Sequence, residues 1–123
     1  MLHIGLQYTS ETIVSDDNTA VAVGSGDLRV FATPAMIALM ENAAMNAVAA
    51  ELPVGSTTVG AAMNTSHVKP SALGAEVKAT AELIGIEGRR LVFKVSACDG
   101  SGTIGEGEHV RYVVDKEKFM SKL

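Results

Sequence analysis

Three polar side chains in this sequence have the chemistry of an acid–base site. Glu41 lies in the middle of the most apolar stretch of the chain, where burying an unpaired carboxylate is costly. His67 carries an imidazole that can exchange protons near neutral pH. Thr33 precedes Pro34 at the predicted start of a helix, where free backbone N–H groups can polarise a carbonyl and stabilise an oxyanion.

Each of these residues also has an ordinary structural interpretation. Thr33 fits the N-cap of a helix, where its hydroxyl would bond to backbone N–H groups. Glu41 can lie on a solvent-facing strip with Asn42 and Asn46, and His67 can be a surface residue. A buried acid usually marks a site or an ion pair, so Glu41 is the most informative candidate.

A second polar pair, His109 and Arg111, alternates on one face of the last predicted strand with Gly105 and Gly107. Arg111 can bind a phosphate, pair with a carboxylate such as Glu41, or lie on the surface. The two glycines predict either the close approach of another backbone or a bulge.

One long helix must position Glu41. Thr33 is expected as its N-cap and Pro34 as its first residue, and the helix should run to about Glu51, before Pro53. It is apolar almost all round, which predicts a buried helix.

The remaining chain predicts strands that wrap this helix. Residues 6–23 read as extended, residues 57–68 as β-rich, and residues 75–83 and 91–97 alternate apolar and polar side chains before a last strand over 103–114. Turns at 87–88 and 99–102 imply an antiparallel meander. The sequence therefore predicts an α+β hot-dog fold, an antiparallel sheet curled around one long central helix, as a single domain over residues 1–123.

Composition excludes several classes of function. The net charge is −4, and only Lys116, Lys118 and Lys122 cluster, as a solvated C-terminal face, so no nucleic-acid partner is expected. The single cysteine, Cys98, excludes an intramolecular disulfide and sits at a strand end, which agrees with a cytoplasmic location. No signal peptide is expected, and the apolar stretch over 35–50 is short for a membrane span.

Familiar catalytic motifs are absent from the sequence. It contains no GxSxG elbow, no P-loop, no GxGxxG and no Cys/His metal spacing, so no cofactor and no metal are expected.

Four segments resemble, in the same order, the fluoroacetyl-CoA thioesterase-like family of hot-dog proteins. The first is residues 30–43, where Thr33 is followed after seven residues by Glu41 in a Leu-Met-Glu-x-Ala context. The others are residues 60–67, residues 87–91 together with 95–100, and residues 104–111. Together the resemblance covers about residues 30 to 119.

The resemblance implies that Thr33, Glu41 and His67 form the catalytic group. Gly60 would position or polarise the thioester, and Arg111 would support the site. In this family the site lies at a dimer interface, which implies a homodimer whose subunits complete each other's sites.

Phe31, just before the helix, is implied as a further substrate-binding residue. The sequence departs from the family in the preceding segment, Gly24–Leu28, which lacks the aromatic lid residues of the fluoroacetyl-specific enzyme. The prediction is therefore hydrolysis of a small acyl-CoA thioester, with the acyl group left open.

Two other functions stay open. One is a non-catalytic hot-dog module that binds an acyl-CoA or another small ligand. The other is a hydratase or dehydratase acting on an enoyl or hydroxyacyl thioester, which no sequence feature favours.

Overall fold

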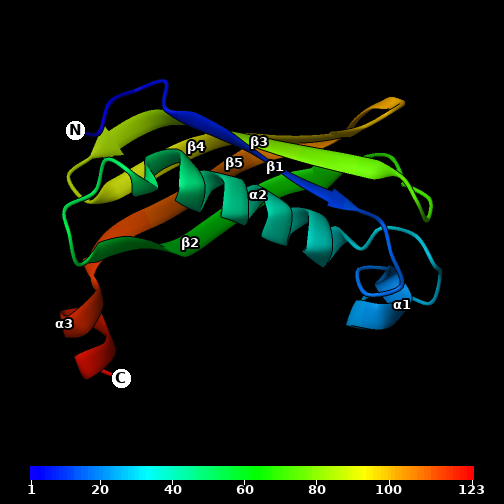
Figure 1. The fold of residues 1–123 in the computed structure, drawn as a ribbon, viewed down its shortest axis with the longest axis horizontal. Helices are drawn as coiled ribbons and strands as arrows, with labels where there is room; N and C mark the ends of the chain where they lie inside the picture. The colour runs from blue at the N-terminus through cyan, green and yellow to red at the C-terminus, as the bar shows by residue number, and fades with distance from the viewer.

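The long helix α2 (Thr33–Ala49) lies across one face of a five-stranded sheet (Figure 1). This computed structural model describes all 123 residues. Every strand pairing is antiparallel, in the order β1-β3-β4-β5-β2, and the α+β hot-dog fold is confirmed. The strands are β1 (Gln7–Ile13), β2 (Ser56–His67), β3 (Glu76–Glu87), β4 (Arg90–Asp99) and β5 (Gly102–Asp115).

The alternation of buried and exposed side chains along the strands determines which face of the sheet packs against the helix. In β3, Val77, Ala79, Ala81 and Leu83 are buried, whereas the residues between them are exposed or half-buried. Strand β4 repeats the pattern with its own buried residues. Because successive side chains in a strand point to opposite faces, both strands turn one apolar face toward α2.

The buried face of α2 consists of Met36, Met40, Ala43, Ala44, Ala47 and Val48. Small side chains on this face and on β3 allow close packing of the helix on the sheet. The expectation of a helix buried on all sides is wrong in this chain, because Ala38, Asn42 and Met45 on the remaining surface are exposed. An apolar sequence therefore leaves part of α2 uncovered.

The start of α2 differs from the prediction. Ala32, in extended conformation, is the N-cap and makes no side-chain capping bond, whereas Thr33 is already helical. The Thr33 hydroxyl is bonded elsewhere, to His67. The helix also ends at Ala49, two residues before the predicted end at Glu51.

The N-terminal region is only partly extended, so the prediction for residues 6–23 is wrong after β1. A short helix, α1 (Ala20–Val23), follows a turn, and the Thr19 side chain accepts a hydrogen bond from the backbone N–H of Ala22. Gly24 ends α1 with a φ of 79°, a left-handed conformation that favours glycine. This local capping outweighed the strand-forming valines of the segment.

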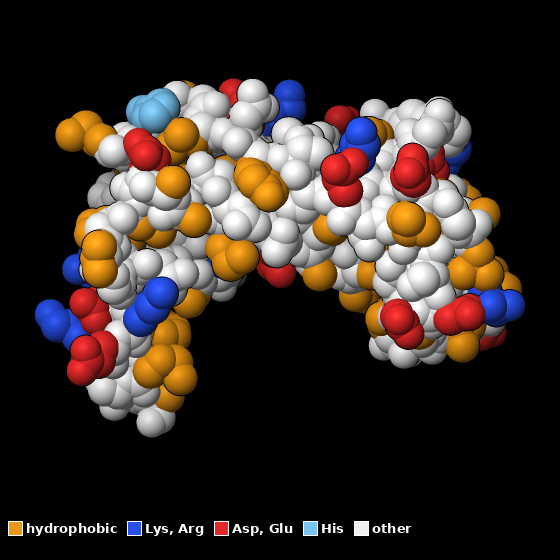
Figure 2. All heavy atoms as spheres, in the orientation of Figure 1, with side chains coloured by type: hydrophobic (Ala, Val, Ile, Leu, Met, Phe, Trp, Pro, Cys, Tyr) orange, Lys and Arg blue, Asp and Glu red, His pale blue; other side chains and the backbone are white.

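Strand β2 lies at one edge of the sheet, and α3 (Lys116–Ser121) projects beyond the end of β5 (Figure 1). In the same view, the molecule is hollowed on its lower side between the α3 end and the α1 end, with apolar side chains at the rim (Figure 2). No helix is long and apolar enough to cross a membrane.

Candidate functional site

A hydroxyl–imidazole pair lies at the N-terminus of α2. Thr33 Oγ1 and His67 Nδ1 are 2.7 Å apart, so the first residue of the helix is hydrogen-bonded to the last residue of β2. The pair joins positions 34 residues apart. A hydroxyl held by an imidazole is an arrangement suited to proton transfer.

The second ring nitrogen of His67, Nε2, is buried and has no hydrogen-bond partner. Buried polar atoms are almost always satisfied, so an orphaned nitrogen needs an explanation. Burial lowers the pKa of His67 below its ordinary value, and the backbone of Lys69 offsets part of that shift. The imidazole is therefore neutral near pH 7 and able to accept a proton.

A cavity of about 300 Å³ opens beside this pair. It is lined by Thr33, His67 and the buried ring of Phe31, together with residues from α1, the following loop and the segment after β2. Phe31, implied as a substrate-binding residue, thus lies next to two of the catalytic candidates.

Glu41 lies further along α2, over the Gly60 backbone. A Cβ at Gly60 would be 3.3 Å from Glu41 Oε2, 3.5 Å from Arg111 Nη1 and 3.5 Å from His109 Cε1. The pairing of β2 with β5 shifts between Gly60 and Ala62, which leaves a bulge at this point. The missing side chain of Gly60 therefore leaves an open position where three functional groups converge.

Arg111 is buried and held from two sides. Its Nε donates to Thr58 Oγ1 at 2.8 Å and its Nη2 to the Thr58 carbonyl at 3.0 Å. Its Nη1 lies 3.1 Å from His109 Nε2. Arg111 is therefore not a surface residue, and it forms no direct ion pair with Glu41. Of the three predicted roles, phosphate binding is the one left open.

The tautomer of His109 follows from its neighbours. Its Nδ1 is 2.7 Å from the Ala62 carbonyl, which can only accept, so Nδ1 carries the proton. Nε2 is then the acceptor for the Arg111 guanidinium. Burial lowers the pKa of His109, and the charge of Arg111 lowers it further. A neutral His109 therefore holds the Arg111 guanidinium toward Glu41. Burial lowers the pKa of Arg111, and the charge of Glu41 offsets part of that shift.

The structure argues against the alternative interpretation of Glu41, in which its side chain lies on a solvent-facing strip with Asn42 and Asn46. Asn42 accepts a hydrogen bond from Ser10 of β1 at 2.7 Å, and Asn46 donates to Asn42. Asn42 is exposed but bonded to β1, whereas half-buried Glu41 faces Gly60 and the Arg111 pair.

One chain does not bring all the catalytic candidates together. Thr33 and His67 form one group, and Glu41, Gly60 and Arg111 form another. The groups are separated by about 12 Å along the helix axis, since α2 rises 1.5 Å per residue. Nowhere do three or more His, Cys, Asp or Glu side chains gather as a metal ion would require.

The sequence does not predict a role for two residues of this site, His109 and Thr58. The sequence places His109 on the same strand face as Arg111 but gives it no role. Because both side chains point to the same face of β5, the burial of one implies the burial of the other. Thr58 carries no sequence signal, because its partner is 53 residues away. A hollow of about 890 Å³ near Cys98 and Asp99 contains none of the candidate residues.

Known proteins are similar to this chain in sequence and in fold. The family described as fluoroacetyl-CoA-specific thioesterase matches residues 14–117. A fluoroacetyl-CoA thioesterase of Streptantibioticus cattleyicolor is 45% identical over 94 residues, which cover 76% of this chain and 68% of that protein.

Solved structures agree with this match. The fluoroacetyl-CoA thioesterase FlK superimposes with a TM-score of 0.93 at 36% identity, over 99% of this chain and 95% of that one. A variant of FlK in complex with fluoroacetate and CoA gives a TM-score of 0.89 at 36% identity, over 96% and 99% of the two chains. A hot-dog-like protein from Thermanaerovibrio acidaminovorans gives 0.88 at 27% identity, over 97% and 88%.

Proposed function

Because this chain belongs to the fluoroacetyl-CoA-specific thioesterase family, it is an acyl-CoA thioester hydrolase, and we propose that Thr33, Glu41 and His67 carry out the hydrolysis. The products are a small free acid and CoA. The observation that carries the site assignment is the Thr33–His67 hydrogen bond with its orphaned, buried Nε2. A buried imidazole nitrogen that has no hydrogen-bond partner and lies next to a helix N-terminus is the arrangement expected of a catalytic site.

We propose that a homodimer completes the site. Strand β2 is an edge strand, and its backbone groups on that side are free to pair with a second copy. If two β2 strands pair antiparallel about a two-fold axis between Met63 and Asn64, His67 of one copy lies opposite Gly60 of the other. The Thr33–His67 pair of one chain then meets Glu41 of its partner.

The groups so assembled divide the chemistry of hydrolysis. The thioester carbonyl lies at the N-terminus of α2, where free N–H groups and the Thr33 hydroxyl stabilise the oxyanion. The Glu41 carboxylate either takes a proton from the attacking water, or attacks the carbonyl and forms an anhydride that water then cleaves to the free acid. Neutral His67 takes up a proton at Nε2, in the water route the one that Glu41 removed, and passes it to the departing thiolate, while Arg111 balances the charge of Glu41.

The acyl group is proposed to be small, without a fluoroacetyl preference. No aromatic residue occurs between Tyr8 and Phe31, and the exposed segment Gly24–Leu28 offers no large side chain beyond Leu28 to close over the cavity. The cavity of about 300 Å³ accommodates a short acyl chain. We place the enzyme in the cytoplasm, since its single cysteine, Cys98, is exposed and free.

Thiol release from a panel of short acyl-CoAs tests the activity, with wild type and Glu41→Gln measured side by side. We expect release by the wild type and a loss of at least about a hundredfold in kcat for Glu41→Gln, with an unchanged fold by circular dichroism. CoA binding without release by the wild type would instead favour the binding module. Equal rates in the two proteins would remove Glu41 from the mechanism.

Mixed dimers test the shared site. Glu41→Gln and His67→Ala chains are each inactive alone, but a heterodimer with a trans site keeps one intact combination. After random reassociation the mixture should recover about a quarter of wild-type activity, because half the dimers are mixed and each has one good site. A mixture as inactive as its components would show that each site is built from one chain.

A further inference from the structure

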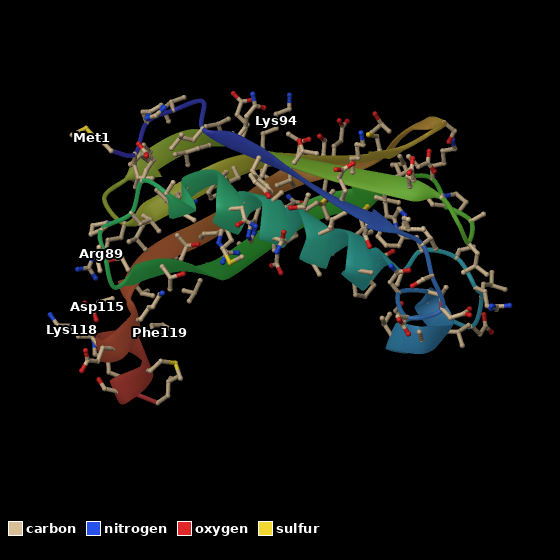
Figure 3. The ribbon with its side chains drawn as sticks, viewed as in Figure 1. Met1, Arg89, Lys94, Asp115, Lys118 and Phe119 are labelled. Carbon is tan, nitrogen blue, oxygen red and sulfur yellow. The ribbon has the colours of Figure 1, made fainter.

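A groove of about 440 Å³ lies where α3 leaves β5, away from the catalytic candidates. Its walls come from the loop after α2, the start of β2, the turn before β4, the end of β5, and α3. The lining residues are Pro53, Ser56, Arg89, Val113, Val114, Asp115, Lys118, Phe119 and Lys122. Figure 3 shows Arg89, Lys118 and Phe119 gathered at this end of the molecule.

The groove is positively charged in an otherwise acidic protein. Arg89, Lys118 and Lys122 are exposed, and none of them takes part in an ion pair. The one acid in the lining, Asp115, accepts the backbone N–H of Lys118 and so caps α3. Three free cations in one groove, against a net charge of −4, attract an anionic ligand.

The groove also has an aromatic wall. Phe119 is one of only five aromatic residues in the chain, and it is 37% exposed. Beside it lie the apolar side chains of Pro53 and Val113. An exposed ring next to cations is the combination that binds a nucleotide, since the base stacks and the phosphates pair with the cations.

The distance between the groove and the proposed catalytic site matches the length of the substrate. Ser56 pairs with Asp115 at the groove, and Gly60 pairs with Arg111 below Glu41. Four residues of extended strand separate the two positions, about 13 Å at 3.3 Å per residue. The pantetheine arm of CoA separates its thioester from its diphosphate by a comparable length.

We propose that this groove binds the 3′-phosphorylated ADP part of the acyl-CoA substrate. The adenine stacks on Phe119, and the phosphates pair with Arg89, Lys118 and Lys122. This inference rests on the proposed thioesterase function and adds a second subsite to it. It also gives a role to Lys118 and Lys122, for which the sequence predicts only a solvated face.

The test compares an acyl-CoA with the matching S-acylpantetheine, which lacks the nucleotide. In the double variant Arg89→Gln/Lys118→Gln we expect KM for the acyl-CoA to rise about tenfold, with kcat nearly unchanged. KM for the S-acylpantetheine should stay the same. The control is Lys78→Gln/Lys94→Gln, which removes the same charge from exposed positions outside the groove and should leave KM unchanged.

Phe119 provides an independent variant. Phe119→Ala should raise KM for the acyl-CoA, and Phe119→Trp should restore it, because an indole also stacks on adenine. A merely structural role of Phe119 would change the melting temperature without this split between the two substrates.

The outcomes separate the groove from the catalytic proposal. Equal KM values of the wild type for acyl-CoA and S-acylpantetheine would overturn the groove and leave hydrolysis intact. If the wild type hydrolyses neither compound, calorimetric titration with adenosine 3′,5′-bisphosphate and with CoA decides the groove alone. Binding that weakens in the groove variant and not in the control supports it, and binding that is equal in all proteins overturns it.

Discussion

At the scale of single residues, His109 is the least replaceable member of the Glu41 group. It is fully buried, and its two ring nitrogens are committed to Ala62 and Arg111. Because one nitrogen must donate and the other accept, only a neutral imidazole satisfies both neighbours. The direction of the Arg111 guanidinium therefore depends on the protonation of His109.

Replacing His109 by leucine should lower both stability and turnover. The change leaves the Ala62 carbonyl and one Arg111 N–H without partners, at about 1–3 kcal/mol of unfolding free energy. We expect kcat to fall because Arg111 loses its direction, with a smaller effect on KM. His109→Gln, whose amide can donate and accept, should recover part of kcat. Urea unfolding and steady-state kinetics measure the two effects, and a kcat equal to wild type in His109→Leu would contradict the positioning role.

Gly60→Ala should damage activity and leave the fold intact. The added Cβ would lie 3.3 Å from Glu41 Oε2, closer than ordinary contact, so the carboxylate must shift. A misplacement of about 1 Å can cost about a hundredfold in rate, so this smaller shift should cost about tenfold. Gly100→Ala is the matched control, because its Cβ would meet nothing within 4 Å. Thiol-release kinetics with thermal melting checks both variants, and a fully active Gly60→Ala enzyme would exclude the open position from the site.

At the scale of elements, close pairing of β2 on β5 determines where His67 lies. A Cβ at Gly107 would be 2.1 Å from the Asn64 carbonyl oxygen, and one at Gly105 would be 2.5 Å from that of Ser66. The predicted close approach of a backbone is confirmed for both glycines, and the pairing of β5 with β4 is also irregular next to Gly105. Gly105 pairs directly with His67, so this approach brings the imidazole to Thr33.

Gly107→Ala should destabilise the protein far more than a surface substitution. The new methyl group overlaps backbone, which cannot move away as a flexible side chain can, and we expect a loss of about 2–3 kcal/mol in unfolding free energy. Gly100→Ala again serves as the control. Chemical denaturation of the two variants provides the comparison. Similar stabilities would mean that β2 can shift without cost.

At the scale of the whole molecule, the pH dependence of stability follows from the shifted groups. Burial lowers the pKa of His67 and of His109, so the unfolded chain binds more protons than the folded one below the ordinary histidine value. Hydrogen bonds from Ser101 and Ser71 lower the pKa of Asp99 to about 2, from 3.8. Its contribution to stability is present above 3.8 and is lost as the pH falls toward 2.

We therefore expect the free energy of unfolding to be highest near pH 7, to fall through the histidine range, and to fall again below pH 3.8. Urea titrations at several pH values measure this. If the chain is a single domain, far-UV circular dichroism and an inserted fluorophore should report the same transition. Asp99→Asn should remove only the most acidic decline, and an unchanged acid profile in that variant would contradict the assignment.

Much of the protein can be predicted from the sequence by itself, because local patterns carry that information. Alternation in residues 75–83 identifies β3 and its buried face, and Thr33-Pro34 marks the start of α2 to within a residue. The candidate catalytic residues can also be recognised from their neighbours in the sequence, since Glu41 is a carboxylate within an apolar helix. These features depend on near neighbours and on periodicity.

Only the tertiary structure decided which candidates meet. The Thr33 hydroxyl could bond its own helix or a distant imidazole, and the choice depends on a strand 34 residues away. Arg111 had three possible roles until the burial of β5 and its bonds to Thr58 excluded the surface. The division of the site into two groups along α2 also follows from packing, because close approach of β2 to β5 places His67 at one end of the helix and Gly60 beside Glu41.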